Sequence, residues 1–325
     1  MKVLVTGGGG FLGGAIVRKL VGRDDSVAVL SRTPADWFVS LGVTHFAADL
    51  TDTAAVTRAA AGCDAVVHVA AKAGVWGPFA EFHRVNVLGT LGVIEACRHA
   101  GVPRLVYTST PSVVHDGASL DGVTEAAPYP AHFDAPYPAT KALAEQAVLA
   151  ANGPTLSTVA LRPHLIWGPG DPHLIPRVLA KARAGRLRRV GNHRVIVDVT
   201  YVENAADAHI LALDRVAPGA ACAGRAYFVT NGEPVELWDF LNRVLALHGL
   251  PPVMRTDPVW AAKLAGATLE AAYRLLRRAN EPPLTRFVAA QLSTSHLYDI
   301  TAARRDLGYA PAVSVAEGLR RLAGG

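Results

Sequence analysis

The sequence predicts an α/β protein with a doubly wound parallel sheet and a smaller, mixed C-terminal lobe. Short apolar runs alternate with longer helical patterns in the first half of the chain, an order that is typical of βαβ units. Several runs, such as residues 65–70, are apolar without alternation, as expected of strands that helices cover on both faces. A glycine-rich loop follows the first run directly.

The strands and helices follow one another in a simple order. Six strands are predicted at residues 2–6, 26–30, 44–48, 65–70, 104–109 and 155–161. After about residue 165 the alternation weakens, and the helical patterns at 235–248 and 259–278 have no regular strand partner. A helix at 201–213 is expected to pack back on the sheet. The chain is therefore expected to form a first domain at 1–165, to which 195–230 partly return, and a lobe at 166–325.

Composition and charge favour a globular protein of the reducing cytoplasm. Half of the 325 residues are apolar, which is enough for a large core. Cys63, Cys97 and Cys222 are far apart and have no ligand-spaced histidine, so neither disulfides nor a metal site are expected. No secretory signal is expected, because the first apolar run leads directly into the glycine loop. No transmembrane segment is expected either, because no apolar run is long enough. The basic run at 181–189 contains few aromatic residues, which favours a solvated helix end over nucleic-acid binding.

The loop after the first strand carries the first functional signal. Gly7, Gly10 and Gly13 follow a strand and open a helical pattern that begins with Phe11 and Leu12. This spacing lets the backbone approach a pyrophosphate closely and directs the N–H groups of a helix N-terminus at its charge. Residues 1–165 are therefore predicted to be a dinucleotide-binding domain of the Rossmann type, and residues 166–325 mainly a substrate-binding lobe.

The end of the second strand bears on which dinucleotide is preferred. A carboxylate at this point favours NAD(H), because it accepts hydrogen bonds from the ribose hydroxyls. This chain has Ser31 and Arg32 there instead, a hydroxyl and a guanidinium that suit a 2′-phosphate. The sequence thus favours NADP(H), with NAD(H) as the alternative; in that case Arg32 would only lie against the adenine.

Tyr137 and Lys141 form the second functional signal. They are four residues apart, and on a helix this spacing places a phenol and an ammonium on the same face. A neighbouring ammonium favours the phenolate, so Lys141 is expected to lower the pKa of Tyr137 toward the range of a general acid or base. Pro138 suits the first turn of that helix. The preceding strand ends in Thr108, Ser109 and Thr110.

Over nearly its full length the chain resembles the extended short-chain dehydrogenase/reductases. The similarity rests on the glycine loop at 6–13, the acidic dipeptide Asp49-Leu50, residues 86–90 (NVLGT) and the Tyr137/Lys141 pair. It implies that Tyr137 transfers a proton, that Lys141 holds the nicotinamide ribose, and that Thr110 orients the carbonyl, with Ser109 as the alternative to Thr110. It also implies that Asp49 and Leu50 meet the adenine, that Ala70, Ala71 and Lys72 lie on the nicotinamide side, and that Asn86 is structural.

Within that family the sequence resembles the 3β-hydroxysteroid dehydrogenase branch, and most of all the bacterial 2-alkyl-3-oxoalkanoate reductases of olefin biosynthesis. Residues 71–77, 107–113, 165–171 and 281–287 carry this resemblance. It implies reduction of a 2-alkyl-3-oxoalkanoate to a 2-alkyl-3-hydroxyalkanoate with NADPH. The alternatives are a hydroxysteroid or sterol dehydrogenase, a nucleotide-sugar epimerase, and a non-catalytic NADP sensor. A dehydratase is disfavoured, because residues 111–114 lack the acidic pair that such enzymes carry there.

Several features remain open at this stage. Residues 260–279 predict an amphipathic helix that either lines a greasy cleft, covers the lobe, or lies on a membrane or partner surface. Arg162, Arg177 and the arginines at 183–189 are candidates to meet a substrate carboxylate. Trp76 and Trp167 are either pocket walls or core. The resemblance implies a homodimer formed through helices at 87–99 and 138–150, and association with other lipid-pathway enzymes is a further possibility.

Overall fold

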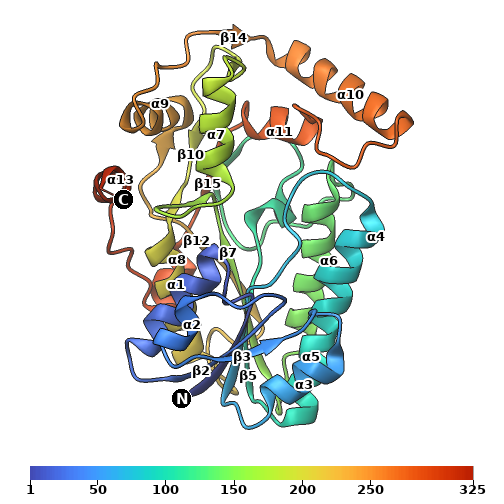
Figure 1. Ribbon diagram of the computed structural model, residues 1–325, viewed down its shortest axis with the longest axis vertical. Coiled ribbons are helices and arrows are strands. Elements are labelled where there is room, and N and C mark those ends of the chain that lie inside the picture. The colour runs from blue at the N-terminus through green and yellow to red at the C-terminus, as the bar shows by residue number, and fades with distance from the viewer. Residues whose placement is uncertain (325) are drawn as a thin grey trace.

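The computed structural model describes residues 1–324 and contains one large parallel sheet (Figure 1). Its seven strands lie in the order β12-β7-β5-β4-β1-β2-β3. Their bounds are β1 Lys2–Thr6, β2 Ser26–Ser31, β3 Thr44–Ala47, β4 Ala65–His68, β5 Arg104–Thr108, β7 Ser157–Pro163 and β12 Arg225–Val229. The order reverses between β1 and β4, which is where ligands bind in open α/β sheets.

Helices cover both faces of this sheet. On one face lie α1 (Phe11–Val21) and α8 (Val202–Arg215), and on the other α3 (Thr53–Ala60), α5 (Gly89–Ala100) and α6 (Pro136–Ala150). Along β1, Val3 and Val5 enter the core beneath α1 and α8, whereas Leu4 enters the core beneath α3 and α5. Burial on both sides explains why these strands are apolar without alternation.

These observations confirm the predicted doubly wound α/β fold. The six predicted strands are present, with ends that differ by up to two residues: β7 is Ser157–Pro163 rather than 155–161, and β4 ends at His68 rather than at 70. The helix predicted at 201–213 is α8, and it packs on the sheet as expected. The seventh strand, β12, was not predicted. It extends the sheet beyond β7, with Tyr227 opposite Leu161.

The second half of the chain adds small sheets and a group of helices. One sheet has four strands in the order β13-β10-β15-β6, and two further pairs are β11-β8 and β14-β9. The bounds are β6 Leu120–Val123, β8 Ile166–Trp167, β9 Arg189–Val190, β10 Ile196–Val197, β11 Thr200–Tyr201, β13 Val235–Glu236, β14 Thr256–Asp257, β15 His296–Tyr298, α7 Leu174–Arg183, α9 Leu237–Leu247, α10 Val259–Leu275, α11 Arg286–Gln291, α12 Thr301–Leu307 and α13 Val315–Ala323. This mixed lobe was expected from the weaker periodicity after residue 165.

Short helical segments complete the chain. They are α2 Trp37–Ser40, α4 Phe79–Phe82, the π-helix η1 His83–Leu88 and the 3-10 helix η2 Pro111–Val114. The lobe with α7, α9, α10 and α11 stands over the carboxyl ends of the sheet strands (Figure 1). No helix within residues 1–324 is both long and apolar enough to cross a membrane.

Candidate active site

The loop between β1 and α1 has a shape that requires glycine at two positions. Gly7 has a φ of +71°, and a Cβ there would lie 2.9 Å from the backbone N and Cα of Ala70. A Cβ on Gly13 would lie 2.2 Å from the carbonyl oxygen of Gly7. Gly10 donates its N–H to that same carbonyl at 3.0 Å and is the N-cap of α1. The loop therefore runs close to the residues that follow β4 and leads directly into α1.

The N-terminus of α1 suits an anion. Phe11 and Leu12 form its first turn, with Leu12 buried and Phe11 half-buried, and no side chain caps the helix. The first N–H groups of a helix have no partner within the helix and carry its positive dipole end. A dinucleotide pyrophosphate therefore fits this loop, both in shape and in charge.

The residues predicted for the adenine end lie at the ends of β2 and β3. Ser31 is half-buried at the end of β2, and Arg32 beside it is exposed and forms no ion pair within residues 1–324. Asp49 accepts hydrogen bonds from the backbone and the hydroxyl of Thr51, and these lower the pKa of its carboxyl. Leu50 is buried.

The residues predicted for the nicotinamide side follow β4. Ala70 lies against Gly7, and Ala71 and Lys72 continue the loop. The amide of Asn86 fixes this loop: its Oδ1 accepts from the Lys72 N–H at 2.7 Å, and its Nδ2 donates to the Lys72 carbonyl at 3.1 Å and to Thr140 Oγ1 at 3.0 Å. This arrangement agrees with the structural role expected of Asn86, since it ties β4 to α6.

The three candidate catalytic residues lie on two neighbouring elements. Tyr137 is in the first turn of α6, Lys141 is one turn further along, and Thr110 follows β5. The Thr110 hydroxyl lies near the Tyr137 phenol and favours its ionised form, and it donates to Ser112 Oγ at 3.3 Å. The Lys141 ammonium donates instead to the Thr108 carbonyl at 2.5 Å. Ser109, the alternative to Thr110, is buried, and its hydroxyl has no hydrogen-bond partner within residues 1–324. The fold thus pairs Tyr137 with Thr110.

The pKa values at this site differ from the sequence expectation. Burial raises the pKa of Tyr137 to about 12, and the nearby Thr110 hydroxyl opposes that rise only in part. Burial also lowers the pKa of Lys141 to about 7, although the nearby Glu145 carboxylate favours the charged form. The expected lowering of the Tyr137 pKa by Lys141 is therefore wrong for this structure, because the ammonium points to a backbone carbonyl and desolvation dominates.

Three buried histidines escaped the sequence analysis. His115 follows η2, His164 follows β7 and His296 lies on β15, and their rings meet in one cluster. His115 Nε2 and His296 Nε2 are 3.0 Å apart, and Gln291 lies 3.3 Å from His115. Burial lowers the pKa of all three, to about 3 for His164 and about 2 for His296. No spacing in the sequence links them, since they come from three separate elements.

Arg162, a candidate to bind a substrate carboxylate, has a different role. It is 2 % exposed and pairs with the fully buried Glu145, with an Nη2–Oε1 distance of 2.6 Å. The Tyr129 hydroxyl donates to the same carboxylate at 2.7 Å. The prediction for Arg162 is therefore wrong: buried charges need partners, and this guanidinium already has its carboxylate.

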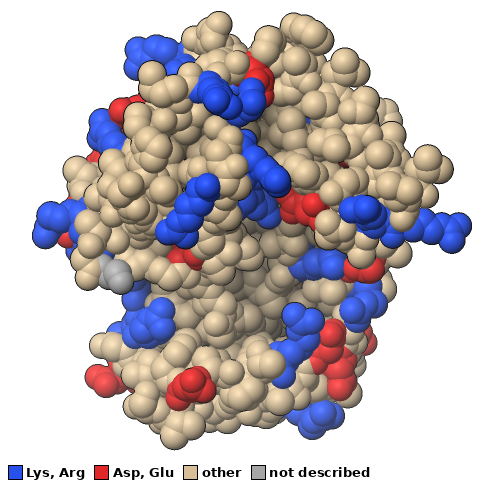
Figure 2. Space-filling view, turned by 45° about the horizontal axis from the view of Figure 1, so that its top comes forward, with Lys and Arg blue, Asp and Glu red and all other residues tan. Residues whose placement is uncertain are grey.

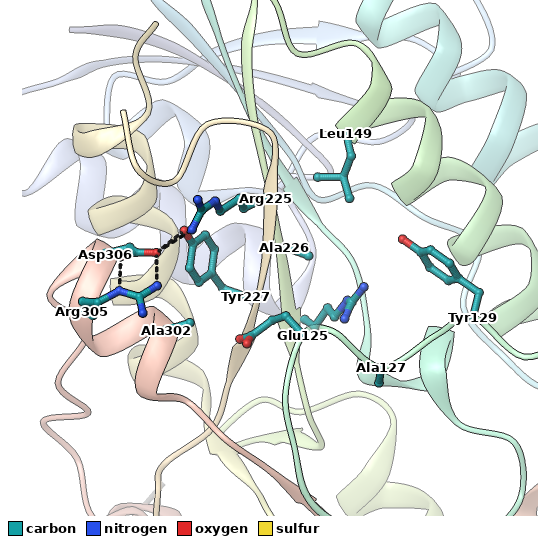
Figure 3. Close-up of a pocket in the computed structure, with 11 residues that line it drawn as sticks. Glu125, Ala127, Tyr129, Leu149, Arg225, Ala226, Tyr227, Ala302, Arg305 and Asp306 are labelled. Atoms are coloured by element: carbon teal, nitrogen blue, oxygen red, sulfur yellow. Dashed lines mark hydrogen bonds and ion pairs between the residues drawn. The ribbon is translucent and has the colours of Figure 1, made fainter. Parts of the chain in front are cut away.

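Arg162 is one of the residues that line a pocket of about 330 Å³, which Figure 3 shows. Its lining residues are Glu125, Ala127, Tyr129, Leu149, Arg162, Arg225, Ala226, Tyr227, Ala302, Arg305 and Asp306. Leu149 is near the end of α6, whereas Tyr137 is at its start, so about 18 Å of helix separates them. This pocket is therefore not the catalytic cleft.

The remaining candidates divide between core and cleft. Trp167 is fully buried between Tyr201 and Phe240 and belongs to the core. Trp76 is half-buried after β4, and its Nε1 donates to the Arg278 carbonyl at 3.3 Å.

Among the basic candidates, Arg177 pairs with Glu281, Arg188 with Asp257 and Arg189 with Glu236. Figure 2 shows a hollow between the two lobes, with Lys and Arg side chains around its rim.

Comparison with known proteins places this fold and site in a family. Residues 4–257 match the 3-beta hydroxysteroid dehydrogenase/isomerase family. The chain belongs to this family. The match spans the glycine loop, the sheet and the Tyr137/Lys141 pair, and it confirms the predicted branch of the short-chain dehydrogenases.

Individual members of this family are similar over almost the whole chain. A 2-alkyl-3-oxoalkanoate reductase of Stenotrophomonas maltophilia is 53 % identical over 99 % of this chain and 98 % of its own length. One of Shewanella oneidensis is 48 % identical over 98 % of this chain and 84 % of its own length. These relatives confirm the predicted resemblance and bear out an oxidoreductase that acts on an alcohol or carbonyl group.

A solved structure supports the fold beyond the family. The UDP-glucose 4-epimerase of Thermus thermophilus, in complex with NAD, superposes with a TM-score of 0.72 at 27 % identity. The superposition covers all of this chain and 98 % of that one. The likeness therefore includes the C-terminal lobe as well as the sheet.

Proposed function

We propose that this dehydrogenase-family chain reduces a 2-alkyl-3-oxoalkanoate to a 2-alkyl-3-hydroxyalkanoate with a nicotinamide dinucleotide. The observation that carries the proposal is the near-full-length similarity to two reductases of that activity. The candidate site supports it, because the Tyr137 phenol, with its pKa of about 12, is in the protonated form that reduction needs at neutral pH. Cofactor binding at the glycine loop is supported by the shape of the loop and by the NAD named for the Thermus epimerase structure.

The residues of the site would divide the work in the following way. A bound nicotinamide dinucleotide supplies a hydride to the substrate carbonyl carbon. Tyr137 donates its phenolic proton to the carbonyl oxygen as negative charge develops there. The Thr110 hydroxyl, which lies near the Tyr137 phenol, orients the same oxygen. Lys141 holds the ribose edge, and the loop fixed by Asn86 carries the backbone that would face the nicotinamide.

The measurement that tests this function is NADPH oxidation, followed by absorbance, with a 2-alkyl-3-oxo acid as substrate. We expect turnover with the oxo acid, and none with a UDP-sugar. A 3-ketosteroid tests the second candidate, which the family's own description favours. Turnover of the ketosteroid alone would change the proposed substrate to a ketosteroid, while the proposed carbonyl reduction would stand. Cofactor binding without turnover of any of the three would favour the sensor alternative.

The preference for NADPH is proposed from Ser31 and Arg32. Arg32 is exposed and forms no ion pair within residues 1–324, so its guanidinium is available for a 2′-phosphate. Arg32→Glu is expected to raise the KM for NADPH by about 10-fold or more and to leave the KM for NADH unchanged or lower. The measurement is the ratio of kcat/KM for the two cofactors. Arg58→Glu, on α3, is a charge-matched control, and an unchanged ratio in Arg32→Glu would contradict the assignment.

The domain boundaries and the dimer are also proposals. We take residues 1–165, with part of 195–230, as the cofactor domain and the rest as the substrate lobe. The position of β12 in the main sheet supports the assignment of part of 195–230 to the cofactor domain.

A homodimer through residues 87–99 and 138–150 is supported by exposed leucines there, Leu88, Leu91 and Leu143. Partner enzymes of lipid metabolism follow only from the substrate class.

A further inference from the structure

The Ser31 side chain, at the end of β2, lies beside the glycine loop. A Cβ on the exposed Gly9 would lie 4.0 Å from Ser31 Oγ. Ser31 is half-buried, and the exposed Arg32 follows it. In dinucleotide-binding folds, the side chain at this strand end reads the 2′ position of the adenosine ribose. Any group that sets the direction of the Ser31 hydroxyl proton therefore bears on the choice between a 2′-hydroxyl and a 2′-phosphate.

A histidine on the neighbouring strand contacts Ser31 through one ring nitrogen. His45 lies in β3, and its Nε2 is 3.0 Å from Ser31 Oγ and 3.1 Å from the Ser31 carbonyl oxygen. The parallel register sets His45 opposite Val29, two residues before Ser31. Side chains two residues apart on a strand point to the same face of the sheet. The pairing of β2 with β3 thus places the imidazole and the hydroxyl together.

The hydrogen bonds around Ser31 identify His45 Nε2 as a donor. The Ser31 hydroxyl donates to the Thr33 carbonyl at 2.8 Å, so towards His45 its oxygen accepts. The Ser31 carbonyl oxygen can only accept, and it also takes the Ala48 N–H at 3.2 Å. Nε2 therefore carries a proton, in the neutral as in the charged imidazole. Ser31 is held by donors from the β3 side, while its own proton can rotate from Thr33 to another acceptor.

The His45 ring is held by packing against the same side chain that supports the glycine loop. The centres of the His45 and Phe38 rings are 5.3 Å apart, with 37° between their planes. Phe38 is buried, and its Cζ would lie 3.5 Å from a Cβ on Gly9. The imidazole, the Ser31 hydroxyl and the glycine loop therefore form one packed unit at the adenosine end of the candidate cofactor site.

We propose that His45 is a positioning residue for the 2′-phosphate of NADPH: its Nε2–H, donated to Ser31 Oγ, directs the Ser31 proton to a phosphate oxygen beside Arg32. A hydroxyl that accepts one hydrogen bond becomes a better donor in the next, and a bond to a charged acceptor gains most. The inference rests on the proposed use of NADPH. It extends the selectivity for the phosphate from the end of β2 to β3.

Cofactor binding, measured by calorimetry without substrate, tests the role of His45 apart from turnover. The readout is the ratio of the dissociation constant for NADH to that for NADPH. His45→Phe keeps an aromatic ring against Phe38 and removes the N–H. It is expected to lower this ratio by about 3- to 10-fold, the usual effect of one hydrogen bond, with little change in the dissociation constant for NADH.

Two further variants separate the N–H group from the bulk of the ring. His45→Gln supplies an amide N–H at a similar reach and is expected to restore most of the ratio. His83→Phe is the matched control, because His83 is also half-buried and lies against a phenylalanine, Phe79, at 5.8 Å and 34°. The control is expected to leave the ratio unchanged.

A double-mutant cycle shows whether His45 acts through Ser31. In a Ser31→Ala background, His45→Phe is expected to leave the ratio unchanged, because the hydroxyl that His45 directs is gone. An unchanged ratio in His45→Phe alone, or the same decrease with and without the Ser31 hydroxyl, overturns the proposal. Equal binding of NADH and NADPH by the wild type would overturn the NADPH preference as well. A preference that Arg32→Glu abolishes and His45→Phe leaves intact would overturn only the role of His45.

Discussion

Tyr137→Phe is expected to lower kcat for ketone reduction by about 10²–10⁴-fold, the usual contribution of a positioned general acid. The phenol carries its proton at neutral pH, because burial raises its pKa to about 12. Phenylalanine removes only the hydroxyl and keeps the ring in place. The measurement is the steady-state rate with NADPH and a 2-alkyl-3-oxo acid, beside the dissociation constant for NADPH, which should change little.

The control for Tyr137→Phe is Tyr129→Phe, which removes a hydroxyl that donates to the buried Glu145 carboxylate. This variant is expected to lose some stability and to keep its turnover. A Tyr137→Phe enzyme that reduces the ketone at the wild-type rate would remove Tyr137 from the chemistry. Another proton donor would then have to be sought near Thr110.

Lys141→Met is expected to abolish efficient turnover and at the same time to stabilise the folded protein without cofactor. Lys141 is 2 % exposed, and burial lowers its pKa from 10.5 to about 7. In the folded protein Lys141 is either buried as an ammonium or has lost its proton. At neutral pH a pKa shift of this size lowers the free energy of unfolding by on the order of a few kcal/mol. Methionine fills a similar volume without that cost. Urea denaturation at pH 7 measures the difference in free energy of unfolding.

The pH dependence of the free energy of unfolding distinguishes the ionisation of Lys141 from a general packing effect. Between about pH 7 and 10.5 the unfolded chain keeps the Lys141 proton and the folded chain has lost it. The wild-type free energy of unfolding therefore rises with pH in this window, at up to about 1.4 kcal/mol per pH unit from this group. The advantage of Lys141→Met should shrink over the same window. Lys263→Met, at an exposed position of α10, controls for loss of a lysine. A constant advantage of Lys141→Met at all pH values would rule out the ionisation cause.

Local sequence pattern was sufficient for the parts of this protein that depend on neighbours in the chain. Unbroken apolar runs indicated the buried strands of the parallel sheet, because strands covered on both faces have no polar side. The glycine loop was predictable since Gly7 needs a positive φ and Gly13 has no room for a Cβ. The spacing of Tyr137 and Lys141 determined their common helix face.

Long-range packing decided the rest. The sequence shows no partner for the Arg162 cation, and only the fold brings it to Glu145. The strand β12 joins the sheet by pairing with β7, and the three histidines come together from three separate elements. Burial of the Tyr137 phenol raised its pKa where a lowering was expected, and the Lys141 ammonium donates to the Thr108 carbonyl. The sequence marked α10 as amphipathic, yet the direction of its apolar face depended on what packs beneath it. Periodicity records which residues share a face, whereas burial and partners are set by elements distant in the chain.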